Sequence, residues 1–175
     1  MTTLPATLTN DNTVIPLSRI AVIDLEASSL GSSSFPTEIG WALLNDDGTI
    51  STSGACLIRP TAKWTTYANA WSAASERLTG ITRDMLDRDG VSPREAAERF
   101  LAAVGDRDLY SDEVDFDRHW LTMLADGAGV SLGQRGLGDV KRLSERSTVA
   151  ANEPPHHRAE ADARRLALAL SRSRP

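Results

Sequence analysis

The stretch Arg19-Ile20-Ala21-Val22-Ile23-Asp24-Leu25-Glu26 constrains the fold of this chain more than any other feature. Its apolar, β-branched body predicts a buried β-strand. Asp24 and Glu26 stand at the end of this strand, and alternate residues of a strand point to the same face. Two such carboxylates repel each other and resist burial, and a divalent cation between them resolves both problems. The pattern therefore favours a cation site over its alternative, a solvated strand end with two unrelated acids.

The rest of the chain predicts a sheet with helices around it. Strands are expected at residues 38–44 and 49–58, joined by the turn signal Asn45-Asp46-Asp47-Gly48, and a short strand at 108–111. Apolar spacing and capping residues predict helices, at residues 70–78, 92–104, 116–124, 137–146 and 158–170. Residues 133–138 are expected to form a flexible connection. The order predicts one α/β domain with a mixed central β-sheet flanked by α-helices.

Length and composition fit a soluble protein with a single domain. The chain has 175 residues, of which 41% are hydrophobic and 25% charged, and no apolar run approaches the ~18 residues that span a bilayer. Residues 1–17 are polar and lack the basic start and apolar stretch of a signal peptide. We therefore expect a flexible N-terminal segment at 1–17, a domain at 18–175 and a cytoplasmic location.

Charge and cysteine content argue against a protein with a broad basic nucleic-acid-binding surface and against an enzyme with a cysteine nucleophile. The net charge of −5 argues against a protein that holds nucleic acid mainly through a broad basic surface. It does not argue against an enzyme that grips phosphate through metal ions, because such a site is itself acidic. Cys56 is the single cysteine, so no internal disulfide forms. Its apolar neighbours predict a buried, inert thiol.

Further acids and a histidine stand near the predicted helix starts. Asp162 lies on the last helix and His157 lies five positions before it, where an imidazole is well placed to take a proton from water. The alternative is a surface helix start with a solvated histidine. Asp112, Asp115 and Asp117 surround the start of the helix near residue 116, and capping is the expected role of at least one of them.

Three patches of the sequence resemble the motifs of the DEDDh exonucleases, the family of the polymerase III epsilon proofreading subunit, ribonuclease T and oligoribonuclease. The matching patches are Asp24-Leu25-Glu26, Phe116-Asp117-Arg118-His119-Trp120 and His157-Arg158-Ala159-Glu160-Ala161-Asp162-Ala163. Glu38-Ile39-Gly40 and Leu78-Thr79-Gly80-Ile81-Thr82 also look like family features. The family often has His-Asn shortly before its second Asp, where this chain reads Ser111-Asp112.

The resemblance implies a ribonuclease H-like fold and a two-metal-ion hydrolysis. Asp24, Glu26, Asp117 and Asp162 would hold two Mg²⁺ or Mn²⁺ ions, with Asp24 as the bridging ligand. His157 would be the general base, and the product would be a nucleoside 5′-monophosphate. His156 and His119 are less suitable bases, since His156 is out of register with the third motif and His119 lies on a helix face.

Substrate contacts are predicted from the same resemblance. The loop Ala27-Ser28-Ser29-Leu30 occupies the place where the family approaches the terminal nucleotide, and Leu30 is expected to wedge against a base. Trp64, in an expected loop, is a candidate for stacking on a base, whereas Trp120 is expected in the core. Glu38 is assigned either a place near the terminal sugar or a salt bridge. Asp112 is assigned to the substrate or to an extra ligand position.

The sequence thus predicts a 3′–5′ exonuclease acting on single-stranded DNA or RNA. The resemblance also allows a homodimer, since some members of the family form one. Two alternatives from other classes are a catalytically inactive nucleic-acid-binding module on the same fold and a metal-binding domain with another substrate. The intact acids and His157 favour the enzyme, because a decayed site is expected to lose at least one of them.

Overall fold

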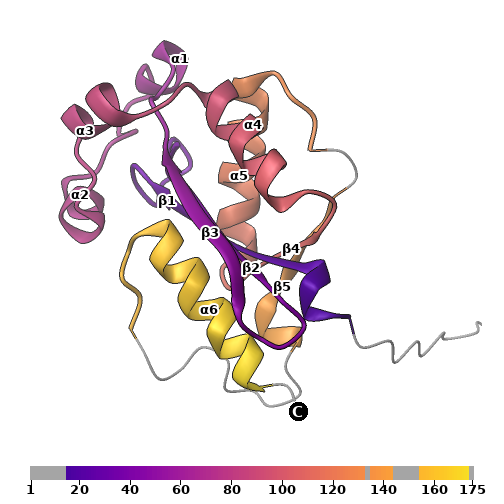
Figure 1. Ribbon diagram of the computed structural model, residues 1–175. Helices are drawn as coiled ribbons and strands as arrows, with labels where there is room; N and C mark the ends of the chain where they lie inside the picture. The colour runs from indigo at the N-terminus through magenta and orange to yellow at the C-terminus, as the bar shows by residue number, and fades with distance from the viewer. Residues whose placement is uncertain (1–14, 133–134, 144–153, 174–175) are drawn as a thin grey trace, which may run out of the picture.

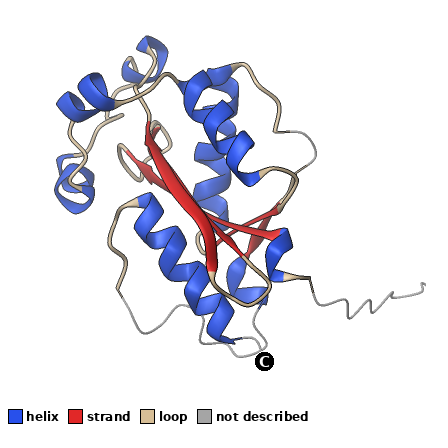
Figure 2. Cartoon of the chain, viewed as in Figure 1, coloured by secondary structure: helices blue, strands red, loops and turns tan. Residues whose placement is uncertain are grey.

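The computed structural model describes residues 15–132, 135–143 and 154–173, which form a five-stranded sheet with helices on both faces (Figures 1 and 2). The strand order is β3-β2-β1-β4-β5. The bounds of the strands are β1 Ile20–Ala27, β2 Pro36–Leu44, β3 Ile50–Leu57, β4 Asp108–Ser111 and β5 Leu137–Asp139. β1, β2 and β3 pair antiparallel, while β4 and β5 add in parallel. The predicted mixed sheet is confirmed.

The helices begin and end at the signals that the sequence carries. Their bounds are α1 Ala62–Thr65, α2 Ala73–Thr79, α3 Arg83–Asp89, α4 Pro93–Val104, α5 Val114–Ala128 and α6 Ala159–Ser173. The Ser92 hydroxyl caps α4 by accepting from the Glu95 N–H. Gly80 and Gly129 end α2 and α5 in the left-handed conformation that glycine adopts without steric cost.

The sheet separates two apolar clusters. Alternate residues of β1 face opposite sides, so Ala21, Ile23 and Leu25 pack toward α4 and α5, while Ile20 and Val22 pack toward α6. Asp24 and Glu26 continue the row that begins with Ile20 and Val22. The strand therefore carries its two acids out of the core beneath α6, at the end where the strand leaves the sheet.

The central strand β1 has an unpaired stretch on its β4 side, and the site lies beside it. β1 pairs with β4 only over Ile20–Val22, because β4 ends at Ser111 and the chain turns into α5. The Leu25 N–H, beyond the paired part, donates instead to Asp117 Oδ1 at 3.2 Å. A side chain of α5 thus replaces the missing strand partner and brings Asp117 beside the end of β1.

One prediction about the chain is revised by the structure, and another falls mostly outside the described residues. The helix predicted at residues 137–146 is wrong: Leu137–Asp139 form β5, Val140–Leu143 form a 3-10 helix, and residues from 144 lie outside the described part. The segment predicted to be flexible, residues 1–17, lies outside the described residues except for Ile15, Pro16 and Leu17. Leu17 is buried in the cluster under α6.

Cys56 is buried in β3, as its apolar neighbours predicted, and burial raises the pKa of its thiol even with Arg99 nearby. Among the described residues, no helix is both long and apolar enough to cross a membrane.

Gly40 sets the distance between β2 and α6, and its replacement is expected to be destabilising. A Cβ at this position would lie 2.2 Å from the Ala159 carbonyl carbon, which is backbone and cannot rotate away. We expect Gly40→Ala to lower the free energy of unfolding by at least about 2 kcal/mol. Urea denaturation would measure this loss, with Gly136→Ala as the control, since a Cβ there meets nothing within 4 Å. Equal stability of the two variants would contradict the close packing of α6.

Candidate active site

Three segments that are distant in sequence bring acidic residues into one cleft of about 690 Å³. The end of β1 supplies Asp24 and Glu26, the turn and first residues of α5 supply Asp112 and Asp117, and α6 supplies Asp162. His157, in the loop before α6, lines the same cleft. The structure therefore brings together all the residues to which the sequence assigned catalysis or metal binding.

The carboxylates form two sets that share one member. Asp24, Glu26 and Asp162 offer oxygens that all lie within 4.8 Å of one another, and so do Asp24, Asp112 and Asp117. Oxygen ligands in groups of this kind suit Mg²⁺ and Mn²⁺. Asp24 is the only residue that belongs to both sets. This is the position that the sequence motifs assigned to a bridging ligand.

The ionisation of these acids shows how unfavourable the site is without a cation. Burial raises the pKa of Asp24 well above its ordinary value, and the charges of Asp117, Glu26 and Asp162 raise it further. Burial, followed by the charge of Glu38, raises the pKa of Glu26 to about 7. Burial likewise raises the pKa of Asp117 to about 7. A divalent cation would offset this repulsion, so the donor set fits such an ion.

Asp117 provides a second, independent sign of a bound ion. Its side chain is almost fully buried, and its Oδ1 accepts from the Leu25 N–H. Burial raises the pKa of Asp117 and the Ser111 hydroxyl opposes this rise, but that hydroxyl makes no hydrogen bond of good geometry with the carboxylate. Oδ2 has no hydrogen-bond partner of good geometry among the described residues. Buried polar atoms are nearly always satisfied, and an unsatisfied carboxylate oxygen within an acidic set is what a metal ligand requires.

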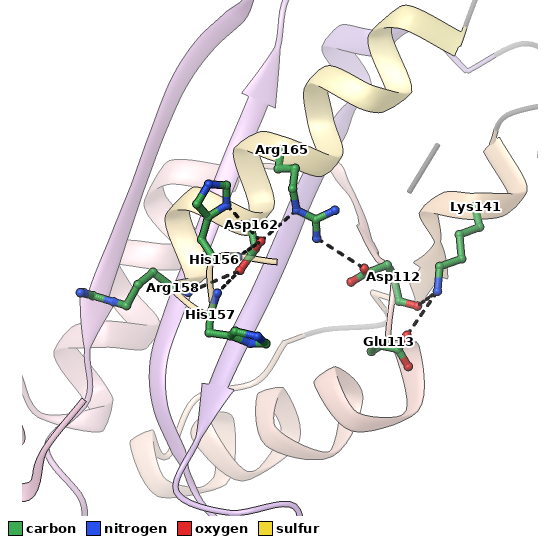
Figure 3. A network of polar contacts seen from close by, with 8 residues as sticks. All are labelled: Asp112, Glu113, Lys141, His156, His157, Arg158, Asp162 and Arg165. Atoms are coloured by element: carbon green, nitrogen blue, oxygen red, sulfur yellow. Dashed lines mark hydrogen bonds and ion pairs between the residues drawn. The ribbon is translucent and has the colours of Figure 1, made fainter. Parts of the chain in front are cut away.

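Asp162 behaves differently from the other acids because it anchors the loop that carries His157 (Figure 3). Its Oδ1 accepts from the His156 N–H at 3.0 Å, and its Oδ2 accepts from the His157 N–H at 2.7 Å and the Arg158 N–H at 3.4 Å. Arg165 Nε donates to Oδ1 at 2.9 Å. Burial tends to raise the pKa of Asp162, but these hydrogen bonds and the Arg165 charge hold it below its ordinary value.

The same anchor explains the unusual backbone of His157. This residue has φ 56°, in the left-handed region that non-glycine residues occupy at a cost of about 1–3 kcal/mol. The three N–H groups that point at Asp162 maintain this conformation. Figure 3 shows the His157 backbone turned toward Asp162 and its ring turned away. The imidazole therefore faces the cleft rather than the helix.

Of the four predicted substrate residues in the loop 27–30, two line the cleft and two hold the loop in shape. Ala27 and Leu30 line it, and Leu30 is 75% exposed. Ser28 and Ser29 are buried, and their hydroxyls accept from the Phe35 and Gly31 N–H groups. Their side chains thus close the loop that presents Leu30.

Glu38 forms the salt bridge that was one of its two predicted roles. Its carboxylate accepts from Arg158 Nη2 at 2.7 Å and Nε at 3.1 Å, and from the Ala159 N–H at 2.9 Å. Glu38 is buried and lies opposite Glu26 in the β1–β2 register. Its contribution to the cleft is therefore the orientation of the loop before α6 and the charge that it places beside Glu26.

The prediction that Trp64 is open for stacking on a base is wrong. Trp64 belongs to α1 rather than to a loop, is buried, and stacks on Phe35 with ring centroids 6.1 Å apart. It is not among the residues that line the acidic cleft. Trp120 is buried, as predicted, and donates to the Ser34 hydroxyl at 2.8 Å. Asp115 is exposed and lies outside the cleft, so Asp112 is the acid that joins Asp117.

The cleft has an apolar rim, which we define as Leu30, Leu78 and Phe116, and of these the sequence predicted only Leu30 as a substrate contact. Leu78 is 58% and Phe116 is 45% exposed, and both line the same cleft as the acids. Phe116 stacks on Trp120 at 5.6 Å. Exposed large apolar side chains that gather beside a polar site usually mark a binding surface. The signal in the sequence was the aromatic residue directly before Asp117, Phe116.

The pH dependence of stability follows from the raised pKa values. Glu26 and Asp117 have ordinary pKa values of 4.5 and 3.8 and reach about 7 in the fold, so the folded state favours their protonated forms. Their favourable contribution is complete below the ordinary values and is lost as pH rises to about 7. In EDTA, we expect the unfolding free energy to fall by about 3 kcal/mol between pH 5 and pH 8. Urea midpoints across this range would test it, and a flat profile would contradict the acidic cluster.

Comparison with known proteins identifies the fold. No protein-family model and no curated protein matches the sequence. Solved structures do match. The zinc-bound complex of E. coli exonuclease I with single-stranded DNA has a TM-score of 0.64 at 12% identity, covering 88% of this chain and 39% of that one. Exonuclease I from Methylocaldum szegediense has a TM-score of 0.63 at 15% identity, covering 89% and 40%.

A third structure is similar over nearly its whole length. The nuclease domain of 3′hExo, a DEDDh family member bound to rAMP, has a TM-score of 0.63 at 17% identity, covering 86% of this chain and 89% of that domain. The chain spans about 40% of the length of the exonuclease I chains. The predicted ribonuclease H-like fold is confirmed, and it is the fold of these nuclease domains.

Proposed function

We propose that this chain, which has the ribonuclease H-like fold of exonuclease I and of a DEDDh nuclease domain, is a metal-dependent 3′–5′ exonuclease. It would release nucleoside 5′-monophosphates from single-stranded DNA or RNA. The observation that supports this most directly is the pair of carboxylate sets that share Asp24, in one cleft with His157. We assign the activity to residues 18–175. A cytoplasmic location and a homodimer are expectations from the sequence.

The acids hold the ions that the reaction needs. Asp24, Glu26, Asp117 and Asp162 are proposed as the ligands of two divalent cations, Mg²⁺ or Mn²⁺. Bound ions of this kind stabilise the negative charge that develops on phosphate and on the leaving 3′ oxygen. The protein supplies the fixed positions, since β1, α5 and α6 are all anchored in the core. Preorganised ligands lose little free energy to rearrangement during the reaction.

His157 is proposed to take the proton from the attacking water. A general base must lie within reach of the water and be a group that accepts protons readily, and histidine is the side chain that enzymes use most often for this role. Its position meets the first condition, because the backbone of His157 is fixed by Asp162 and its ring lines the cleft. The ligand Asp162 therefore also orients the base.

The apolar rim suits an unpaired nucleobase. Leu30, Leu78 and Phe116 present apolar and aromatic surface in the same cleft as the acids. A base that is not stacked in a duplex gains free energy on such a surface, and every base has a suitable face. The rim thus favours single strands without reading their sequence. The catalytically inactive binding module is the weaker alternative, because a full set of acids and a cleft-facing His157 exceed what binding alone requires.

The deciding experiment is a nuclease assay with the purified protein. We would incubate 5′-labelled single-stranded DNA and RNA with Mg²⁺ or Mn²⁺ and resolve the products by length. The expected result is a ladder that shortens from the 3′ end and disappears with EDTA and in His157→Ala. If the wild-type protein binds Mn²⁺ but no substrate shortens, the binding module replaces the enzyme.

Phe116→Ala is expected to weaken substrate binding more than chemistry. Loss of a stacked base contact costs about 1–2 kcal/mol, or roughly 5- to 30-fold in KM, with a smaller change in kcat. Tyr67→Ala is the matched control, because Tyr67 is also 45% exposed but does not line the cleft. Steady-state kinetics on a short labelled oligonucleotide would measure both. An equal KM in the two variants would show that the rim does not hold the base.

A further inference from the structure

Asp112 adds a carboxylate to the four acids that the exonuclease motifs assign. It is the first residue after β4, and its carboxylate lies in the set with Asp24 and Asp117, all oxygens within 4.8 Å. Its side chain is only 17% exposed. A fifth acid is therefore held inside the site, among the other carboxylates.

Arg165 connects Asp112 to the other set. Its side chain is 9% exposed, and its Nε donates to Asp162 Oδ1 at 2.9 Å. Its Nη2 lies 4.0 Å from Asp112 Oδ2. Figure 3 shows the guanidinium reaching from α6 between the two carboxylates. One buried cation thus touches one ligand of the first set and the extra acid of the second.

The charges of this arrangement match two divalent ions. The two sets contain five carboxylates, and Arg165 lowers their combined charge to −4. Lys141, the other nearby cation, donates to the Asp112 backbone carbonyl and pairs with Glu113 at 3.3 Å, so its charge is offset outside the sets. Removal of Asp112 alone would leave the two ions with too little negative charge. Removal of Arg165 alone would leave an excess of negative charge around the two ions.

The second set also contains a carboxylate oxygen without a well-formed hydrogen bond among the described residues. Asp117 Oδ2 is buried without a hydrogen bond of good geometry among the described residues, and it belongs to the same set as Asp112. Arg165 contacts Asp162 and Asp112. A cation held jointly by Asp24, Asp112 and Asp117 would satisfy Oδ2.

We propose that Asp112 is a fifth metal-ligating residue, in the set that it shares with Asp24 and Asp117, and that Arg165 is the positioning residue that ties it to Asp162. The inference rests on the proposed metal-dependent function. It means that the second ion is held by three protein carboxylates. Both ions should then bind before any nucleic acid arrives, because neither set needs a substrate phosphate to complete its charge.

The test is Mn²⁺ binding in the absence of nucleic acid, measured by isothermal titration calorimetry. Wild-type protein is expected to bind two ions. Asp112→Asn is expected to weaken the second ion by about 10- to 100-fold and leave the first unchanged. Asp115→Asn is the matched control, since Asp115 is an exposed acid of α5 outside both sets. Melting in EDTA verifies that each variant folds, and Asp112→Ser serves if Asp112→Asn does not.

The double variant Asp112→Asn with Arg165→Gln separates a ligand from a charge partner. A ligand that is removed stays removed, so the double variant should retain the weak second ion. If wild-type affinity returns in the double variant, Asp112 acts only by balancing Arg165, and the ligand assignment is overturned. Unchanged affinity in Asp112→Asn overturns it as well. Failure of the wild-type protein to bind any Mn²⁺ would instead refute the proposed metal-dependent function.

Discussion

Replacement of Asp24 with Asn is expected to abolish nuclease activity and, at the same time, to stabilise the metal-free protein. Asp24 is the only residue in both carboxylate sets, so its loss removes a ligand from each ion. We expect kcat/KM to fall by at least about 10³-fold. In EDTA at pH 8, we expect the free energy of unfolding to rise by about 1–2 kcal/mol.

The stabilisation follows from the direction of the pKa shift. Burial and the charges of Asp117, Glu26 and Asp162 raise the pKa of Asp24, so the fold disfavours the ionised side chain. At pH 8, the unfolded chain carries this charge freely, whereas the folded chain must hold it beside other acids or bind a proton. Asn has the shape of the protonated acid and avoids both costs.

Thermal melting in EDTA and the oligonucleotide assay would measure the two effects on the same preparations. Asp115→Asn is the control, because it removes an exposed acid in the first turn of α5; it should leave activity unchanged and lower the melting temperature slightly, since a negative charge is favourable there. A rise of about 1–2 kcal/mol corresponds to roughly 2–8 °C in a protein of this size. A lower melting temperature for Asp24→Asn would mean that Asp24 stabilises the metal-free fold, against the pKa argument.

The sequence predicted the elements whose signals are local. β1 follows from an apolar, β-branched run, β2 and β3 flank the predicted turn at residues 45–48, and α4 begins at the predicted Ser92 cap. β5 was missed because a strand of three residues, Leu137–Asp139, has no periodicity of its own and depends on β4 for its hydrogen bonds. The 3-10 helix that follows at Val140–Leu143 carries part of the apolar spacing that suggested a longer helix. The secondary structure of residues 137–143 therefore depends on pairing with β4, which is distant in sequence.

In the site, too, residues with local sequence motifs lie in the cleft as predicted, whereas the positions of residues placed by tertiary contacts were not predicted. Asp24, Glu26, Asp117, His157 and Asp162 were placed from three short motifs, and the structure brings them into one cleft. Trp64 was misplaced because a tryptophan among polar neighbours looks exposed, whereas its ring packs on Phe35 and against Gly127. The buried position of Arg165 could not be predicted from the sequence. An arginine on a terminal helix is usually solvated, and only the tertiary structure shows this one buried between Asp162 and Asp112.

Asp162→Ala is expected to remove activity and, unlike Asp24→Asn, to destabilise the metal-free protein. The hydrogen bonds from His156, His157 and Arg158, together with Arg165, hold the pKa of Asp162 below its ordinary value against the effect of burial. The folded state therefore favours the ionised side chain. Its contribution to stability is complete above the ordinary pKa and is lost only as pH falls below that range.

Two opposing effects act when Asp162 is truncated, and the pKa decides between them. The charge of Asp162 raises the pKa of Asp24 and Glu26, so its removal relieves some repulsion. Its removal also leaves three N–H groups and the buried Arg165 without their acceptor. Because the pKa of Asp162 is lowered overall, the lost contacts outweigh the relief. We expect a loss of about 2–4 kcal/mol in EDTA at pH 8.

Loss of the Asp162 carboxylate should also affect His157, the proposed general base. Without the carboxylate, His157 has no anchor for its left-handed backbone and is expected to relax toward an ordinary conformation. Asp162→Asn tests this separately, since the amide keeps one acceptor oxygen and should retain part of the stability while it loses the ligand charge. Melting in EDTA and hydrogen exchange at His157 and Arg158 would report the anchor. If Asp162→Ala matches the stability of Asp24→Asn, the loop is held by contacts other than this carboxylate, and ligand and base are independent.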